Sequence, residues 1–287
     1  METNELLKKV RKIEIKTKGL SKQVFSGEYH SAFKGRGMAF SEVRNYIPGD
    51  EIRTIDWNVT ARFNQPFVKV FEEERELTVM LLIDISGSES FGSHELLKRE
   101  FIAEIGAVLA FSATQNNDKI GALLFSDQIE LYIPPKKGRK HILRIIRELI
   151  EFKPKSQKTD IGKIVRHFNN LIKKRAIAFL ISDFIGNNFE NALKITSKKH
   201  DLIALRVYDQ REKELTDIGL SKFIDSETGK EKWINTGSKR VREIYKQNAL
   251  SREHEVLEIF KKSKVDHANI ELQSGYIKPL MNLFKKR

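Results

Sequence analysis

Asp84, Ser86 and Ser88 are the residues whose types and spacing are best suited to chemistry. They stand two residues apart, directly after the apolar run Leu77–Ile83. That run has the length and composition of a strand buried on both faces of a parallel sheet. A carboxylate and two hydroxyls at a strand end form a cluster of oxygen ligands, which hard cations such as Mg²⁺ prefer. The pattern therefore indicates a cation site, provided that further oxygen ligands reach it.

Two later residues, Thr159 and Asp183, are expected at the same end of the sheet. Lys119–Phe125 and Ala176–Ile181 have the composition of further buried strands. If these strands run parallel to the first, their carboxyl ends lie along one edge, where open α/β sheets bind ligands. Thr159 precedes a predicted helix that starts at this edge, and Asp183 follows a strand. The oxygen ligands that can meet there, in a number that suits one octahedral cation, are Asp84, Ser86, Ser88, Thr159 and Asp183.

Each of these residues taken alone also fits a plain structural role. Thr159 or Asp160 is suited to capping the N-terminus of a helix. Asp183 is suited to capping a loop, and the two serines to an ordinary turn. Their joint arrival at one edge of the sheet is what favours the metal site.

The elements that must position these residues alternate between helix and strand patterns, which indicates an α/β fold. Ile129–Ile133 alternates as a half-exposed antiparallel strand does, and Pro134-Pro135 is expected to end it at a sheet edge. We therefore expect a mostly parallel sheet with one antiparallel edge strand over residues 76–287. Residues 1–75 are expected to form an N-terminal extension.

Composition excludes several classes of site. The 287-residue chain has no cysteine, so disulfides, thiolate metal sites and cysteine nucleophiles are absent. No apolar run reaches the roughly 18 residues of a membrane span, and the first residues do not resemble a signal peptide. We expect a cytoplasmic protein. The net charge is +13, and residues 134–175 carry 14 Lys+Arg against 3 Asp+Glu. This basic segment suggests an acidic partner or a solvated face.

A second motif lies in the expected extension. Pro48-Gly49-Asp50 consists of residues typical of a turn, and Ile55-Asp56-Trp57 follows it. We expect an ion-pair network around Trp57 in which Arg53 and Arg62 pair with Asp50 and Asp56, and which docks the extension onto the main domain. The functional alternative is an anion or partner site built on the two arginines.

Together these motifs resemble known families. Asp-x-Ser-x-Ser after a buried strand, with the later Thr159 and Asp183, is similar to the metal-ion-dependent adhesion site of von Willebrand factor A domains. That resemblance implies Mg²⁺, or else Mn²⁺ or Ca²⁺, held by all five residues, and a doubly wound sheet with helices on both faces. Gly49-Asp50-x-x-Arg53-x-Ile55-Asp56-Trp57 and Ser182-Asp183-Phe184 resemble the bacterial family called domain of unknown function 58. Its members are encoded beside MoxR-type AAA+ ATPases, which implies a partner of that kind.

The resulting hypothesis is a non-enzymatic, metal-dependent protein-interaction module that acts with the ATPase in protein assembly or maturation. A phosphatase or phosphotransferase of the haloacid-dehalogenase kind is the enzymatic alternative, with Asp84 as nucleophile. That chemistry needs a second Asp two residues on, where this chain has Ser86. A third alternative is binding of an anionic polymer such as nucleic acid through residues 134–175, with an affinity that falls steeply with salt.

Overall fold

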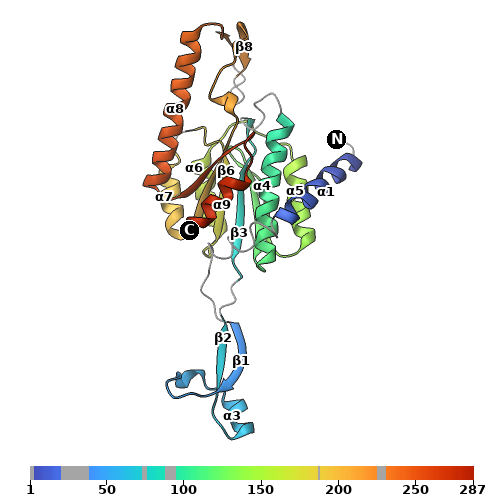
Figure 1. Cartoon of the computed structure of the whole chain (residues 1–287), viewed down its shortest axis with the longest axis vertical. Coiled ribbons are helices and arrows are strands. Elements are labelled where there is room, and N and C mark those ends of the chain that lie inside the picture. The colour runs from blue at the N-terminus through green and yellow to red at the C-terminus, as the bar shows by residue number, and fades with distance from the viewer. Residues whose placement is uncertain (1–2, 21–38, 73–75, 88–94, 187, 225–230) are drawn as a thin grey trace. The chain divides into compact units, whose positions relative to one another are not determined.

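The computed structural model describes residues 3–20, 39–72, 76–87, 95–186, 188–224 and 231–287 (Figure 1). The chain divides into two compact units. The smaller unit is Phe33–Leu77, and the larger unit combines Met1–Ala32 with Thr78–Arg287.

A six-stranded sheet forms the centre of the larger unit, in the order β10-β7-β6-β3-β4-β5. Every neighbouring pair is parallel except β4 and β5, which are antiparallel. This confirms the predicted mixed α/β class with a mostly parallel sheet and one antiparallel edge. The strands are β3 (Thr78–Asp84), β4 (Lys119–Phe125), β5 (Ile129–Lys136), β6 (Ile177–Ser182), β7 (Asp201–Tyr208) and β10 (Asp266–Glu271).

Helices cover both faces of this sheet (Figure 1). Side chains alternate between the faces of a strand, so Met80 and Leu82 of β3 enter the core with α6, α7 and α8. Leu81 and Ile83 approach α4 and α5 on the opposite face, where α9 also packs. The helices are α4 (Glu95–Gln115), α5 (Arg139–Glu151), α6 (Ile161–Leu171), α7 (Glu190–Lys199), α8 (Lys239–Lys262) and α9 (Ile277–Lys285). A separate hairpin joins β8 (Leu220–Ile224) and β9 (Glu231–Asn235). None of the helices in the described ranges is both long and apolar enough to cross a membrane.

The edge strand runs further than the sequence predicted. Pro134 and Pro135 were expected to end it, but β5 continues through both to Lys136. An edge strand tolerates proline because its missing N–H can face the open side of the sheet. The strands also come very close here. A Cβ on Gly121 of β4 would lie 2.8 Å from the Ile133 carbonyl oxygen and 2.9 Å from the Pro135 nitrogen. Glycine at this position is what permits the approach.

The first helix, α1 (Thr3–Leu20), belongs to the larger unit. Ile13 is buried, Glu14 accepts a hydrogen bond from Arg139 of α5 at 2.6 Å, and Lys16 pairs with Glu104 of α4 at 2.6 Å. The expected boundary at residue 75 therefore differs from the compact units, because this amphipathic helix uses its apolar stripe to cover α4 and α5.

The smaller unit pairs β1 (Ala39–Asn45) with β2 (Phe67–Glu72) and carries a 3₁₀ turn, η2 (Ile52–Thr54), and the short helix α3 (Trp57–Phe63). Asp56 begins α3 by accepting hydrogen bonds from the backbone N–H groups of Asn58 and Val59. This is ordinary N-cap chemistry, which satisfies donors that a helix start leaves unpaired.

The predicted ion-pair network of this unit is wrong. Arg44 on β1 binds Asp50 through two hydrogen bonds of 2.7 Å, and Lys69 on β2 lies 3.5 Å from Asp56. The basic residues that pair with these two aspartates therefore come from β1 and β2. No residue of α3 is buried, so the helix offers no interior for a charged cluster around an apolar anchor. The exposed residues that were expected to form that cluster are Arg53, Trp57 and Arg62.

Candidate metal-binding site

The site lies where the chain changes direction across the sheet. From β3 the chain moves to β4 on one side, and it later returns to β6 on the other side. The carboxyl ends of β3 and β6 therefore flank a topological switch point, where open α/β sheets bind ligands. Asp84 ends β3, and Asp183 directly follows β6. Both carboxylates are buried, which calls for compensating charge.

Asp84 is held by both strand ends. Ser182 Oγ donates to its Oδ2 at 2.6 Å, and the Ser86 backbone N–H donates to its Oδ1 at 3.0 Å. Burial raises the pKa of Asp84 to about 7, the repulsion of Asp183 adds to that rise, and the hydrogen bonds of the two serines oppose it. The protonated and ionised forms of Asp84 are therefore similarly populated at neutral pH in the metal-free protein. A cation between the two carboxylates would relieve this repulsion.

A backbone hydrogen bond and aromatic packing hold the loop that carries Asp183. The Ile185 N–H donates to Asp183 Oδ1 at 3.0 Å. Phe184 has a left-handed backbone with φ of 58°, a strained conformation for a bulky residue. Its buried ring packs against Phe189 and Phe260, with centroids 5.9 Å and 4.8 Å away, and this packing holds the loop. The other oxygen, Asp183 Oδ2, is buried without a hydrogen-bond partner.

The Thr159 loop is fixed from two sides. The Gly87 N–H donates to the Gln157 carbonyl at 2.9 Å, which joins this loop to the turn after Asp84. Glu130 Oε1 accepts the backbone N–H groups of residues 155 and 156 at 3.1 Å and 3.2 Å. Thr159 Oγ1 is buried without a hydrogen-bond partner. Asp160, rather than Thr159, caps α6 by accepting the Lys163 N–H at 2.8 Å.

The structure brings together some of the five predicted ligands and not others. The structure brings Asp84, Ser86 and Asp183 together at the switch point and places the Thr159 loop against the same turn. Ser88 lies outside the described residues. Among the described residues, no group of three or more His, Asp or Glu side chains is arranged to hold an ion. The candidate donor set is instead two carboxylates with hydroxyls. Two of its oxygens, Asp183 Oδ2 and Thr159 Oγ1, are buried without a hydrogen-bond partner, although the Lys98 ammonium forms an ion pair with Asp183 Oδ2 at 3.8 Å. This set suits a hard divalent cation.

Three residues of the site were missed by the sequence prediction: Ser182, Lys98 and Glu212. The Lys98 side chain is 2 % exposed, and its ammonium lies 3.1 Å from Glu212 Oε1 and 3.8 Å from Asp183 Oδ2. A signal existed for Lys98, because it precedes Ile102 and Ile105, which are both buried, at helical spacing. A lysine at such a position requires a buried partner. Glu212 gave no comparable signal, since its surroundings are polar.

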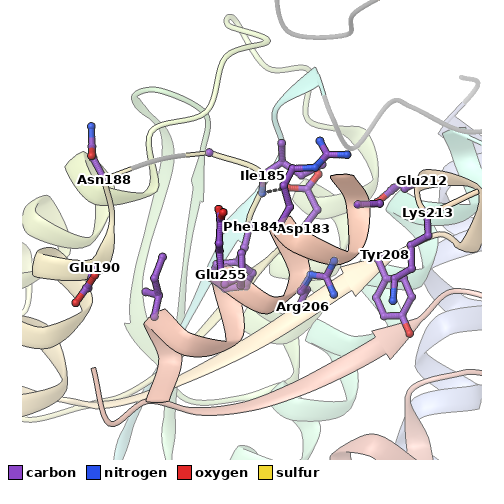
Figure 2. A pocket seen from close by; sticks show the side chains of 15 residues that line it. Asp183, Phe184, Ile185, Asn188, Glu190, Arg206, Tyr208, Glu212, Lys213 and Glu255 are labelled. Atoms are coloured by element: carbon purple, nitrogen blue, oxygen red, sulfur yellow. Dashed lines mark hydrogen bonds between the residues drawn. The ribbon is translucent and has the colours of Figure 1, made fainter. Parts of the chain in front are cut away.

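A pocket of about 470 Å³ opens beside Asp183 (Figure 2). Its walls come from the loop after β6, the end of β7 with the following turn η4 (Gln210–Glu212), and α8. Phe184, Ala249 and Val256 supply apolar wall, while Arg206 and Glu212 supply charge. The candidate metal site therefore borders a cleft of mixed character that could receive part of a partner.

The basic segment 134–175 does not form one face of the sheet. Its exposed lysines at 153, 155 and 158 belong to the Thr159 loop, at the edge that carries the site. Residues 173–175 follow α6 at the opposite end, just before β6 begins. Of these two groups, only the first lies at the end of the sheet that carries the candidate site.

Substituting Gly162 by alanine is expected to destabilise the protein. A Cβ there would lie 2.9 Å from the Asn188 carbonyl oxygen, in the loop that carries Asp183. Overpacking of this kind costs about 1–3 kcal/mol, and the better helix propensity of alanine returns at most ~1 kcal/mol. We expect a lower midpoint in thermal and urea unfolding. Gly19→Ala is the control, because nothing lies within 4 Å of its added Cβ. An unchanged midpoint for Gly162→Ala would contradict this close approach of α6 to the Asp183 loop.

Comparison with known proteins gives one family match. The model of the family described as "Protein of unknown function DUF58" matches residues 42–255. An uncharacterized protein of Mycobacterium bovis is 30% identical over 223 residues, which cover 77% of this chain and 70% of that protein. An uncharacterized protein of Mycobacterium tuberculosis gives the same values.

Solved structures give weaker similarity. An aerotolerance-related membrane protein from Bacteroides fragilis is 18% identical, with a TM-score of 0.48 and coverage of 74% of this chain and 100% of that chain. The conserved hypothetical protein BatB from Bacteroides thetaiotaomicron is 16% identical, with a TM-score of 0.43 and coverage of 73% and 98%.

Proposed function

The chain belongs to the family described as protein of unknown function DUF58, and from this membership we propose that it is a non-enzymatic, Mg²⁺-dependent protein-interaction module with a von Willebrand factor A-like domain. Its proposed partner is a MoxR-type AAA+ ATPase, and its proposed role is in protein assembly or maturation in the cytoplasm. Mn²⁺ or Ca²⁺ are alternative ions for the same oxygen donors.

The observation that carries this proposal is the pair of buried carboxylates at the switch point. Asp84 and Asp183 come from neighbouring parallel strands, and burial, followed by the repulsion of Asp183, raises the pKa of Asp84. Asp183 Oδ2 and Thr159 Oγ1 are buried without hydrogen-bond partners. Buried polar atoms of native proteins are normally satisfied, so two such oxygens near one edge favour a missing ligand.

The residues proposed to hold the ion are Asp84, Ser86, Ser88, Thr159 and Asp183. A bound divalent cation would supply a Lewis-acidic position that a carboxylate of the partner can fill. The chain itself contributes rigidity: Glu130 fixes the Thr159 loop, and the buried ring of Phe184 fixes the loop of Asp183. Preorganisation of this kind lowers the entropic cost of binding.

The arrangement favours binding over phosphoryl transfer. A haloacid-dehalogenase mechanism needs a second Asp two residues after its nucleophilic Asp, as general acid. Here the side chain two residues after Asp84 is the hydroxyl of Ser86, which is a poor proton donor at neutral pH.

The test is binding of the purified chain to a MoxR-type ATPase from the same cell, at constant Mg²⁺. Chelation is unsuitable, because it also strips Mg²⁺ from the nucleotide of the ATPase. We expect Asp84→Asn to weaken the affinity at least tenfold. Asp127→Asn is the matched control, since Asp127 follows the neighbouring strand β4. Equal affinities for wild type and Asp84→Asn would refute a metal-bridged contact.

Reversing the charge of the Thr159 loop should slow association with an acidic partner. The variant replaces the lysines at 153, 155 and 158 by glutamate. The control replaces residues 173–175 by glutamate, which makes the same change in net charge at the other end of the sheet. We expect about a tenfold lower association rate at low salt for the first variant, and a difference that fades as salt rises. Equal rates for the two variants would show that the loop does not steer the partner.

A further inference from the structure

Lys98 is the most deeply buried cation of the described chain that contacts the candidate site. It lies in α4, and its side chain is 2 % exposed. A lysine is rarely buried to this degree unless its ammonium is paired. Here the ammonium reaches two carboxylates, Glu212 at 3.1 Å and Asp183 at 3.8 Å. One side chain thus spans the ends of two neighbouring strands, β6 and β7.

Three acidic side chains, Asp84, Asp183 and Glu212, lie at this end of the sheet. Lys98 contacts the last two. The charge of Asp183 repels both of the other carboxylates when all three are ionised. An ammonium beside Asp183 offsets part of this repulsion when no metal is bound. The same ammonium repels a divalent cation that binds Asp183.

We infer that Lys98 is an internal competitor of the divalent cation: its ammonium stabilises the metal-free site through Asp183 and lowers the affinity of the loaded site. This inference rests on the proposed metal site. Its consequence is a weak, reversible site, in which cation uptake shifts the ammonium toward Glu212. Glu212 lines the pocket beside Asp183, so occupancy of the site and the charge of the pocket wall are coupled (Figure 2).

The geometry of Lys98 supports exchange between the two carboxylates. The Glu212 contact is within hydrogen-bond range, whereas the Asp183 contact is an ion pair 0.7 Å longer. Breaking the longer contact, to Asp183, costs less free energy than breaking the contact to Glu212, because a direct hydrogen bond between charged groups is the stronger interaction. Glu212 lies in η4, the turn that follows β7, so it can keep its contact with the ammonium without belonging to the metal site.

The experiment compares wild type with Lys98→Met, with the double variant Lys98→Met/Glu212→Gln, and with Lys16→Met. Lys98→Met alone leaves the Glu212 carboxylate without its ammonium partner. The double variant also removes that carboxylate charge, so it can be tested even where the single variant folds poorly. Lys16 of α1 is half exposed and pairs with Glu104 of α4, the helix that carries Lys98. Lys16→Met is therefore a control that changes the net charge as Lys98→Met does. Calorimetric titration measures the Mg²⁺ affinity, and thermal unfolding is recorded in EDTA and in saturating Mg²⁺.

We expect the double variant to bind Mg²⁺ at least tenfold more tightly than wild type, and Lys16→Met to bind it equally. We also expect Lys98→Met to lower the unfolding midpoint strongly in EDTA and much less in Mg²⁺. An equal fall in both conditions, or an unchanged or weaker Mg²⁺ affinity in the double variant, would show that Lys98 is only structural. Absence of Mg²⁺ binding by wild type would instead refute the metal site, and the inference with it.

Discussion

Asp84→Asn is expected to abolish Mg²⁺ binding without loss of the fold. Asparagine has the same shape at the end of β3. Its Oδ1 can still accept the Ser86 N–H, and its amide NH₂ can donate to Ser182 Oγ, which reverses the direction of that hydrogen bond. It removes the charge that a divalent cation requires. We expect at least a hundredfold loss of affinity, which is about 2.7 kcal/mol.

Two measurements check this expectation. Calorimetric titration with Mg²⁺ compares Asp84→Asn with the matched control Asp127→Asn, which should bind as wild type does. Thermal unfolding shows the linked stability, because a ligand that binds only the native state raises the midpoint. Wild type should gain stability from Mg²⁺, and Asp84→Asn should gain none. Retained Mg²⁺ binding by Asp84→Asn would remove Asp84 from the site.

The second large effect is a pH dependence of stability that Asp84 confers on the metal-free protein. Burial, followed by the charge of Asp183, raises the folded-state pKa of Asp84 from 3.8 to about 7. Between these values the folded state keeps a proton that the unfolded state releases, so stability falls as pH rises through this window. The contribution of Asp84 is fully present below about pH 4 and is lost above about pH 7. A shift of this size corresponds to about 4 kcal/mol at most.

Mg²⁺ should oppose this loss, because the ion binds the carboxylate and displaces the proton. The stabilisation by Mg²⁺ should therefore be small at pH 5.5 and large at pH 8. Urea unfolding at both pH values, in EDTA and in Mg²⁺, measures the effect. Subtracting the values for Asp84→Asn removes the contributions of other groups, such as Glu212, whose pKa burial also raises. If Asp84→Asn shows the same pH slope as wild type, the slope does not come from Asp84.

Periodicity predicted most of the larger unit, because its strands and helices are long and strongly patterned. The buried run that ends at Asp84 became β3, and Lys119–Phe125 became β4 with the predicted bounds. The prediction failed where local signals compete with tertiary contact. Pro134 and Pro135 are strand breakers by local preference, yet β5 runs through them at the open edge of the sheet. The cations that pair with Asp50 and Asp56 were misassigned because β1 and β2 bring Arg44 and Lys69 closer.

The sequence by itself predicted that Asp84 and Asp183 lie at the carboxyl edge of the sheet, because each residue stands at the end of a strongly apolar strand. It also determined the family of the chain through its motifs. Only the tertiary structure decided the charge balance of the site. Lys98, Ser182 and Glu212 lie far apart in the chain, and their meeting depends on the order of strands across the sheet. Sequence spacing records neighbours along one element, whereas electrostatic coupling depends on distance in space and on burial.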